Sequence, residues 1–435
     1  GIASYAALAA IAIQSNQNDQ HGGQSVPNFD YSMAEGIGKT FRKQYRAKLR
    51  EALEDLLDTD DETALVQAAI EAGKQATGDS DVRLETHAAT FDDAAAKAIA
   101  ATGRLDAGKA AHLVAHARRR ATAKTDRETY QAMEGFVHNL NTMHSRAGAQ
   151  TPFSSINYGT DTSPEGRMAI RNILLAEDAG LGHGETPIFP IHIFKVKEGV
   201  NYNPGDPNYD LFELSCKVSA KRLFPNYVFL DSPFNLQYYK PGHPETEVAT
   251  MGCRTRVMGN VYDPERQIAY SRGNLSFTSI NLPRLAIESH GDEALFYKKL
   301  DDMLELVAQQ LLDRFEIQAS KRVYNYPFLM GQGVWLDSDK LGPNDEVREV
   351  LKHGTLSIGF IGLAETLTAL YGHHHGESDE MQQKGLAIVR HMREFCDAKS
   401  QAMHMNFTLL ATPAEGLSGR FIRMDKKRYG IIPGV

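Results

Sequence analysis

Cysteine is scarce in this 435-residue sequence, which contains only Cys216, Cys253 and Cys396 and no two cysteines separated by two residues. Three cysteines this far apart argue against a disulfide framework and against a cysteine-rich zinc module, so we predict no metal site within the chain. A reducing cytoplasm is therefore the expected compartment.

Long apolar runs and an excess of positive charge are also absent. No run approaches the roughly 18 residues that a membrane-spanning helix needs, and the longest candidate, Ala6–Ile13, reads as a buried helix. The formal net charge of −8 argues against a general nucleic-acid or membrane-surface binder. With 42% hydrophobic and 23% charged residues, the composition is that of a globular protein with a large core.

The sequence pattern changes at about residue 150. Residues 1–150 are mainly helical in character, and Phe41, Tyr45, Leu49 and Leu53 recur there at four-residue intervals. From residue 151 to residue 435, strand-like and helix-like segments alternate, which favours an α/β fold with a largely parallel sheet or barrel. The predicted strands cover residues 152–158, 187–196, 227–230, 267–271, 275–282, 356–361 and 407–410. After the first of them, Ser163 is predicted to cap a helix over residues 163–177.

One cysteine stands in a setting that suits chemistry. Cys253 follows Gly252 in a segment with little helical or strand character, and Asn274 opens a β-rich run further along the chain. A lone cysteine is more often an inert buried residue than a reactive one. Both interpretations of Cys253 are therefore open on the residues alone.

Three other patterns could bind a ligand or a metal. Residues Thr412–Gly416 lie where an apolar strand gives way to a helix, and the free N–H groups of a helix N-terminus suit phosphate. Glu415 is equally explained as a partner of the helix dipole. His373–His375 favours a surface loop over a metal site, because adjacent residues do not share a face. Gly180–Gly184 lacks the Lys-Ser/Thr ending of a phosphate-binding loop.

Four short segments follow one another along the chain: Met251–Arg254, Gly273–Leu275, Asn281–Arg284 and Thr412–Glu415. Together with others spread over most of the chain, they resemble the class III anaerobic ribonucleoside-triphosphate reductases of the glycyl radical enzyme family. The Ala-rich residues 80–124 are the part that does not match. The resemblance is carried by Gln20–Gly23, Gln150–Phe153, Thr186–Pro190, Asp206–Asp210, Met251–Arg254, Gly273–Leu275, Asn281–Arg284, Ser357–Gly362 and Thr412–Glu415.

The resemblance implies a ten-stranded α/β barrel of the ribonucleotide reductase and glycyl radical enzyme type, incomplete at both ends. Residues 1–150 would be a mainly helical effector and dimer region, and residues 151–435 a barrel core with a finger loop around 250–255. In such enzymes the loop cysteine, here Cys253, becomes a thiyl radical and abstracts the ribose 3′-hydrogen. Enclosure would protect this radical from side reactions.

The resemblance also assigns roles to individual residues. Asn274 would orient the substrate, and Met251 resembles the branch of the family that uses formate as reductant. The remaining assignments are substrate-binding residues Thr412, Pro413, Ala414, Glu415, Gly416, Thr151 and Ser155, and effector-binding residues Lys43 and Gln20.

The family also implies partners and groups beyond these residues. Partners would be ribonucleoside triphosphates, dNTP or ATP effectors, a radical SAM iron–sulfur activating enzyme and a second copy of the chain. The glycyl-radical motif, the four-cysteine zinc site and the ATP cone have no counterpart here, so we expect a fragment that is inactive alone. Alternatives are another glycyl radical enzyme of the formate-lyase type, or a non-catalytic nucleotide-binding or dimerisation relative.

Overall fold

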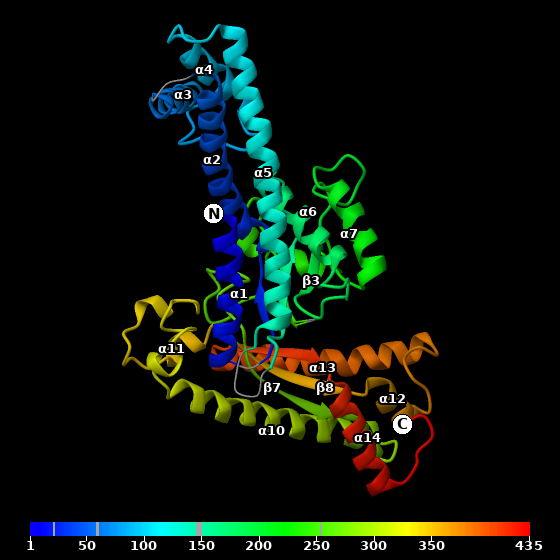
Figure 1. The fold of residues 1–435 in the computed structure, drawn as a ribbon. Coiled ribbons are helices and arrows are strands. Elements are labelled where there is room, and N and C mark those ends of the chain that lie inside the picture. Colours follow the sequence, from blue (N-terminus) through cyan, green and yellow to red (C-terminus); the bar gives the residue numbers. More distant parts are fainter. Residues whose placement is uncertain (21, 58–60, 145–149, 253–254) are drawn as a thin grey trace. The chain divides into compact units, whose positions relative to one another are not determined.

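The computed structural model describes residues 1–20, 22–57, 61–144, 150–252 and 255–435. These residues divide into two compact units, Gly1–Arg256 and Val257–Val435. Each unit has its own parallel sheet and its own hydrophobic core (Figure 1). Cys253, the predicted radical carrier, lies outside the described residues.

The first unit begins with a group of long helices. α1 (Ile2–Asp19), α2 (Phe29–Leu56) and α5 (Ala107–Thr142) pack on one another, and α3 (Glu62–Thr77) and α4 (Ala88–Ala100) pack together beside them (Figure 1). The four apolar residues predicted to share one face of α2 are all buried: Phe41, Tyr45, Leu49 and Leu53. A four-residue spacing places them on a single stripe of the helix, which confirms that prediction.

The sheet of the first unit has four parallel strands in the order β1-β2-β3-β4. They are β1 (Gln24–Val26), β2 (Ser154–Tyr158), β3 (Ile191–Val196) and β4 (Asn226–Phe229). The helices α6 (Pro164–Ala179) and α7 (Tyr209–Arg222) connect successive strands, and Ser163 caps α6 as predicted, by accepting from Gly166 N. β2 and β3 are buried along their whole length, as interior strands of a parallel sheet are.

The first unit ends with short elements that the sequence did not predict. After α8 (Pro233–Leu236) and a 3₁₀ turn at Pro244–Thr246 comes β5 (Ala249–Met251), which pairs with β6 (Thr255–Val257). A strand of three residues is too short to show the alternation by which strands are recognised. β1 was not predicted either, because it is also only three residues long.

The second unit is built on three parallel strands in the order β7-β8-β9, namely β7 (Asn274–Asn281), β8 (Thr355–Ile361) and β9 (Asn406–Ala411). The long helices α10 (Glu293–Ala319) and α13 (Asp379–Met403) supply the helical side of its core (Figure 1). The shorter elements are α9 (Leu282–Ile287), α11 (Arg348–Leu351), α12 (Leu363–Tyr371), α14 (Glu415–Tyr429) and 3₁₀ turns at Val323–Asn325 and Ser338–Lys340.

The predicted α/β class with parallel sheets is confirmed, whereas the ten-strand count and the division at residue 150 stay predictions. The strand predicted at 267–271 is wrong, since these residues are irregular. The Ile268 carbonyl accepts a hydrogen bond from Arg272 Nη1 and not from the backbone of a neighbouring strand, and Ser271 has a φ of 57°. β3 begins at Ile191, not at residue 187, since Pro190 has no N–H to donate to a ladder. None of the described helices combines the length and the apolarity needed to cross a membrane.

Candidate active site

The backbone of Thr250, in the middle of β5, is held by three side chains from β1 and β2. Its carbonyl oxygen accepts hydrogen bonds from Ser25 Oγ (2.9 Å), Ser155 Oγ (3.3 Å) and Asn157 Nδ2 (3.0 Å). Its N–H donates to Asn157 Oδ1 at 2.9 Å. The Asn157 amide thus satisfies both backbone polar groups of one residue, as a neighbouring strand would.

Gly252 continues this segment towards the predicted reactive cysteine. Its φ of 59° lies in the left-handed region that favours glycine, and its N–H donates to Ser155 Oγ at 3.1 Å. A Cβ atom at this position would lie 2.7 Å from Cε1 of Phe153. Glycine is therefore required both by the conformation and by the space. Met251, one residue earlier, is half-buried.

A buried ion pair anchors the chain just before β5. Lys195 Nζ, on β3, donates to Glu247 Oε2 at 2.9 Å and to Asn28 Oδ1 at 2.7 Å. The Lys195 side chain is 0% exposed and that of Glu247 is 6% exposed. Thr160 Oγ1 donates to the same Glu247 oxygen at 2.8 Å. Each charge needs the other, because an uncompensated buried charge is strongly destabilising. The signal in the sequence is a lysine inside β3, a strand that is mostly apolar.

A second buried carboxylate, that of Asp30, fixes the loop that follows β2. Asp30 Oδ2 accepts hydrogen bonds from the backbone N–H groups of Gly159 (2.8 Å), Thr160 (3.1 Å) and Asp161 (3.1 Å). Burial raises the pKa of Asp30 to about 6, although the nearby Lys195 ammonium acts in the opposite direction. This carboxylate therefore ties the start of α2 to the end of β2.

In the second unit, Asn274 begins β7 and faces two hydroxyl groups of β8. Its Oδ1 accepts from Thr355 Oγ1 (3.2 Å) and Ser357 Oγ (3.1 Å), and Ser357 is bonded in turn to Thr408 Oγ1 at 2.8 Å. Within the described part of the chain, Asn274 Nδ2 makes no hydrogen bond. The amide is therefore oriented through its oxygen, and its nitrogen is free to donate.

A second hydroxyl pair lies near the carboxyl ends of the same strands. Ser279 Oγ and Thr412 Oγ1 are 2.8 Å apart, and Thr412 N donates to the Phe360 carbonyl at 3.0 Å. The two hydroxyls meet above Gly359, where a Cβ atom would lie 2.2 Å from Thr412 Oγ1 and 2.8 Å from Ser279 Oγ. The absent side chain of Gly359 is what allows this contact, which the sequence did not reveal.

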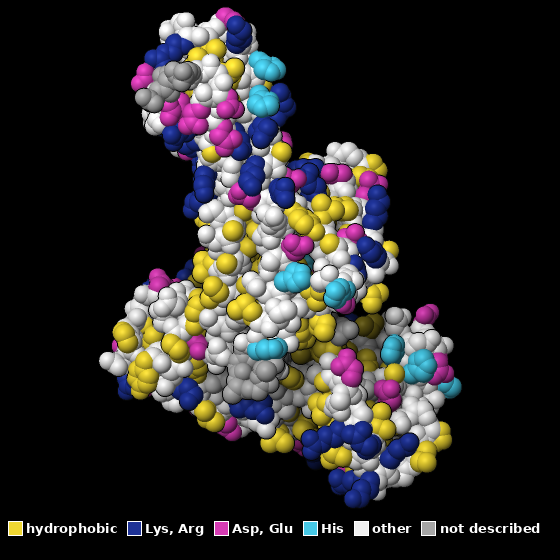
Figure 2. Space-filling view, in the orientation of Figure 1, with side chains coloured by type: hydrophobic (Ala, Val, Ile, Leu, Met, Phe, Trp, Pro, Cys, Tyr) yellow, Lys and Arg dark blue, Asp and Glu magenta, His cyan; other side chains and the backbone are white. Residues whose placement is uncertain are grey.

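The predicted phosphate-binding turn leads into α14. The helix begins at Glu415, and the residue before it, Ala414, supplies no side-chain cap. Glu415 and Gly416 are exposed, whereas Thr412, Pro413 and Ala414 are half-buried. α14 has no buried residue, and Figure 2 shows Lys and Arg side chains gathered over it. The uncapped start of the helix leaves backbone N–H groups available for an anion.

The other predicted residues lie in the first unit. Lys43 is exposed on α2, and Gln20 follows α1 and donates to Gln24 Oε1 at 3.0 Å. Thr151 is half-buried ahead of β2, and the hydroxyl of Ser155 is engaged by β5 as described above. Their proposed ligand roles stay predictions. His373–His375 forms an exposed turn after α12, as predicted for a surface loop.

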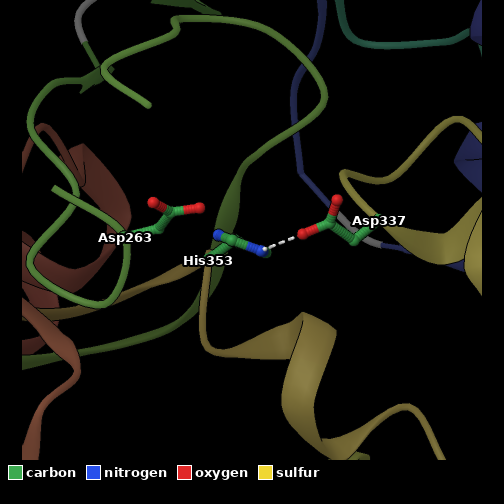
Figure 3. A group of neighbouring side chains, drawn as sticks. All are labelled: Asp263, Asp337 and His353. Atoms are coloured by element: carbon green, nitrogen blue, oxygen red, sulfur yellow. Dashed lines mark hydrogen bonds and ion pairs between the residues drawn. The ribbon is translucent and has the colours of Figure 1, made fainter. Parts of the chain in front are cut away.

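Asp263, Asp337 and His353 form a compact cluster in the second unit (Figure 3). His353 Nε2 lies 3.0 Å from Asp337 Oδ2, and Arg266 already pairs with both carboxylates, at 2.6 Å from Asp263 and 2.5 Å from Asp337. The Arg266 hydrogen bonds hold the pKa of Asp337 well below its usual range, and burial lowers that of His353. Because a guanidinium occupies the position that a cation would take, the cluster is a structural ion-pair network.

Comparisons with known proteins agree on one family. The family described as "Anaerobic ribonucleoside-triphosphate reductase" matches residues 1–435. The Escherichia coli K12 protein of that name is 35% identical over 321 residues, which cover 72% of this chain and 43% of that protein. The enterobacteria phage T4 protein of the same name is 32% identical over 329 residues, which cover 74% of this chain and 51% of that protein. The chain thus spans about half the length of these relatives, or less.

A solved structure with a similar chain is the anaerobic ribonucleotide reductase from Thermotoga maritima in complex with dATP and CTP. Its TM-score is 0.47 and its sequence identity is 13%, over 93% of this chain and 72% of that chain. The same reductase with glycerol in the active site gives a TM-score of 0.48, also at 13% identity, over 93% of this chain and 71% of that chain.

Proposed function

Because the chain belongs to the anaerobic ribonucleoside-triphosphate reductase family, we propose that it supplies the substrate-reducing core of such an enzyme. The family match over all 435 residues carries the proposal. The way β5 is held beside β1 and β2 supports it, because a reacting group must be placed accurately before it can attack an unactivated C–H bond.

Cys253 is the proposed hydrogen-abstracting residue. As a thiyl radical, its sulfur takes the hydrogen atom from C3′ of the ribose, which leaves the radical on C3′. The 2′-hydroxyl then leaves as water with one added proton. Formate supplies two electrons together with a hydrogen for C2′ and is released as CO₂, and the Cys253 S–H returns its hydrogen atom to C3′. Overall, one ribonucleotide, one formate and one proton are converted to one deoxyribonucleotide, one CO₂ and one water.

The remaining residues are proposed to bind and orient the substrate. Asn274 has a fixed oxygen and a free Nδ2 that can donate to a ribose hydroxyl. The hydroxyl of Thr412 and the uncapped start of α14, residues 413–416, would receive the triphosphate, since helix N-termini attract anions. Thr151 and Ser155 are the proposed additional substrate contacts, and Met251 is proposed to lie beside the formate.

The zinc site and the glycyl radical of the family do not fit the residues of this chain. A four-thiolate zinc site needs four cysteines, and the sequence has three, at positions 216, 253 and 396. No Arg-x-Cys-Gly-Tyr run is present either. In the family, the glycyl radical would accept the hydrogen atom of the thiol and so leave the unpaired electron on sulfur.

Regulation and assembly are proposed by the same reasoning. Lys43 and Gln20 would contact a deoxynucleotide or ATP effector in the helical region, which would also form the homodimer. A radical SAM iron–sulfur enzyme would act as the activating partner, in a cytoplasmic setting. The ammonium of Lys43 is exposed and therefore accessible to a phosphate.

The test is anaerobic conversion of ribonucleoside triphosphates by the activated full-length gene product. We expect formate-dependent formation of deoxynucleotides, complete loss in Cys253→Ser, and retained nucleotide binding in that variant. Cys216→Ser is the matched control, because Cys216 is an exposed thiol for which no chemical role is proposed. Full activity in Cys253→Ser would reject the thiyl role, and turnover driven only by a dithiol protein would reject formate.

A further inference from the structure

We infer that Asn157 is a positioning residue, whose side-chain amide sets the place of Thr250–Gly252 and, through them, of the reacting position that follows Gly252 in the chain. This inference rests on the function proposed above. Asn157 is separate from the residues proposed to touch substrate, and it would act through the backbone of Thr250.

The geometry leaves the Asn157 amide one orientation. Its Oδ1 accepts from Thr250 N at 2.9 Å, and its Nδ2 donates to Thr250 O at 3.0 Å and lies 3.0 Å from Ser25 Oγ. The residue is 0% exposed. A reversed amide would place donor against donor and acceptor against acceptor, so both ends of the group are specified.

β5 is not a strand of the parallel sheet: it pairs with β6, and the Asn157 amide is what connects its Thr250 backbone to β2. β1 pairs with β2, and β2 with β3, through their own backbones. The Thr250 backbone meets β2 only through side chains, and Thr250 is 4% exposed. Without Asn157, the Thr250 N–H is buried and loses its hydrogen-bond partner, which native structures rarely tolerate.

Loss of Asn157 should therefore displace β5 and leave the parallel sheet in register. The ladder between β1 and β2 pairs Ser25 with Ser155 and Val26 with Ile156 through the main chain, and it does not use the Asn157 side chain. The proposed phosphate-binding residue Thr412 belongs to the second unit. The expected signature is a lower kcat with unchanged substrate affinity, which a general loss of stability does not produce.

The experiment compares three variants of the full-length gene product. Asn157→Ala removes both hydrogen bonds to Thr250, and Ser25→Ala removes one of the three donors to its carbonyl. Asn172→Ala is the matched control: Asn172 is 2% exposed, and its Nδ2 bonds to Asp126 Oδ1 (2.8 Å) and to the Met168 carbonyl (2.9 Å), away from β5. Anaerobic kcat and the equilibrium Kd of the ribonucleotide are measured for each.

We expect Asn157→Ala to lower kcat by roughly 100-fold, the size expected from a misplacement of about 1 Å, with Kd changed less than threefold. Ser25→Ala should lower kcat by less than Asn157→Ala does, because two donors to the Thr250 carbonyl remain, and Asn172→Ala should leave kcat unchanged. An unchanged kcat in both Asn157→Ala and Ser25→Ala overturns the inference. The inference is also overturned if Asn172→Ala loses as much kcat as Asn157→Ala, or if Asn157→Ala loses substrate affinity in parallel with kcat.

A second readout needs no turnover. Iodoacetamide labelling of Cys253 is measured against Cys216 in the same molecule, by quantifying the two alkylated peptides. Asn157→Ala should change the Cys253-to-Cys216 labelling ratio at least threefold, and Asn172→Ala should not change it. If the wild type proves inactive, the proposed function fails while this ratio still decides the positioning role. An unchanged ratio in Asn157→Ala overturns it.

Discussion

Gly359→Ala, a substitution on β8, should disturb the hydroxyl pair formed by Ser279 on β7 and Thr412 after β9, without changing the backbone conformation. The added methyl group would lie 2.2 Å from Thr412 Oγ1 and 2.8 Å from Ser279 Oγ, closer than any ordinary van der Waals contact. Gly359 sits in the middle of β8 with no positive φ, so alanine is compatible with its backbone. The expected loss of stability therefore comes from the contacts of the added methyl group with the two hydroxyl groups.

The size of the effect follows from three contributions. Insertion of a methyl group into a packed site costs about 1–3 kcal/mol, and separating the hydroxyls loses one hydrogen bond of about 1 kcal/mol. Replacing glycine by alanine restricts the unfolded chain and returns about 0.4–1 kcal/mol. The second unit should lose about 1–3.5 kcal/mol of unfolding free energy as a result.

The assay uses Trp335, the sole tryptophan of the sequence, which is 2% exposed in the core of the second unit. Its fluorescence during urea unfolding reports that unit alone. In a Thr412→Ala background, the nearest clashing atom is gone, so Gly359→Ala should cost at least about 1 kcal/mol less. Equal costs in both backgrounds would show that the hydroxyl pair is not the reason for glycine.

Two further predictions concern the buried charges of the first unit. Lys195→Met should lower the unfolding free energy by about 3–5 kcal/mol, because it leaves the buried Glu247 carboxylate without its positive partner. The double variant Lys195→Met/Glu247→Leu should lose less unfolding free energy than Lys195→Met alone. Urea unfolding followed by far-UV circular dichroism measures both variants, and an equal or larger loss in the double variant would contradict the argument. Folding raises the pKa of Asp30 from 3.8 to about 6, so the folded state binds more protons between these values, and stability falls as the pH rises through them. Asp30→Asn should remove that part of the fall between pH 4 and pH 6; an unchanged pH profile would show that Asp30 does not titrate in this range.

The sequence predicted the parts of the fold that repeat over many residues. The stripe on α2, the Ser163 cap and most strands of the two sheets follow from periodicity and capping, which are local properties of the chain. β1 and β5 were missed because three residues carry no periodicity. The strand predicted at 267–271 failed because Arg272 takes the Ile268 carbonyl, which is a contact of the tertiary structure.

The candidate site was predictable only in part, for the same physical reason. Motif resemblance indicated Asn274 and Thr412, whose neighbourhoods contain recognisable short segments. Asn157, Glu247 and Gly359 gave no local signal, because each acts on a residue at least 50 positions away. A buried polar residue in an apolar strand shows that a partner exists, and only the folded chain shows which partner it is.

The proposed phosphate site at the start of α14 would make use of the hydroxyl pair of Ser279 and Thr412. Each hydroxyl can donate one hydrogen bond, and at present one of the two donors serves the other residue. A phosphate oxygen arriving beside α14 could take that donor after a rotation about the Cα–Cβ bond of either side chain. The rotation costs one neutral hydrogen bond, about 1 kcal/mol, whereas a hydrogen bond to a charged oxygen returns about 1.5–3 kcal/mol. The balance favours the bound arrangement, and it depends on Gly359, because a methyl group there would already have separated the hydroxyls in the free protein.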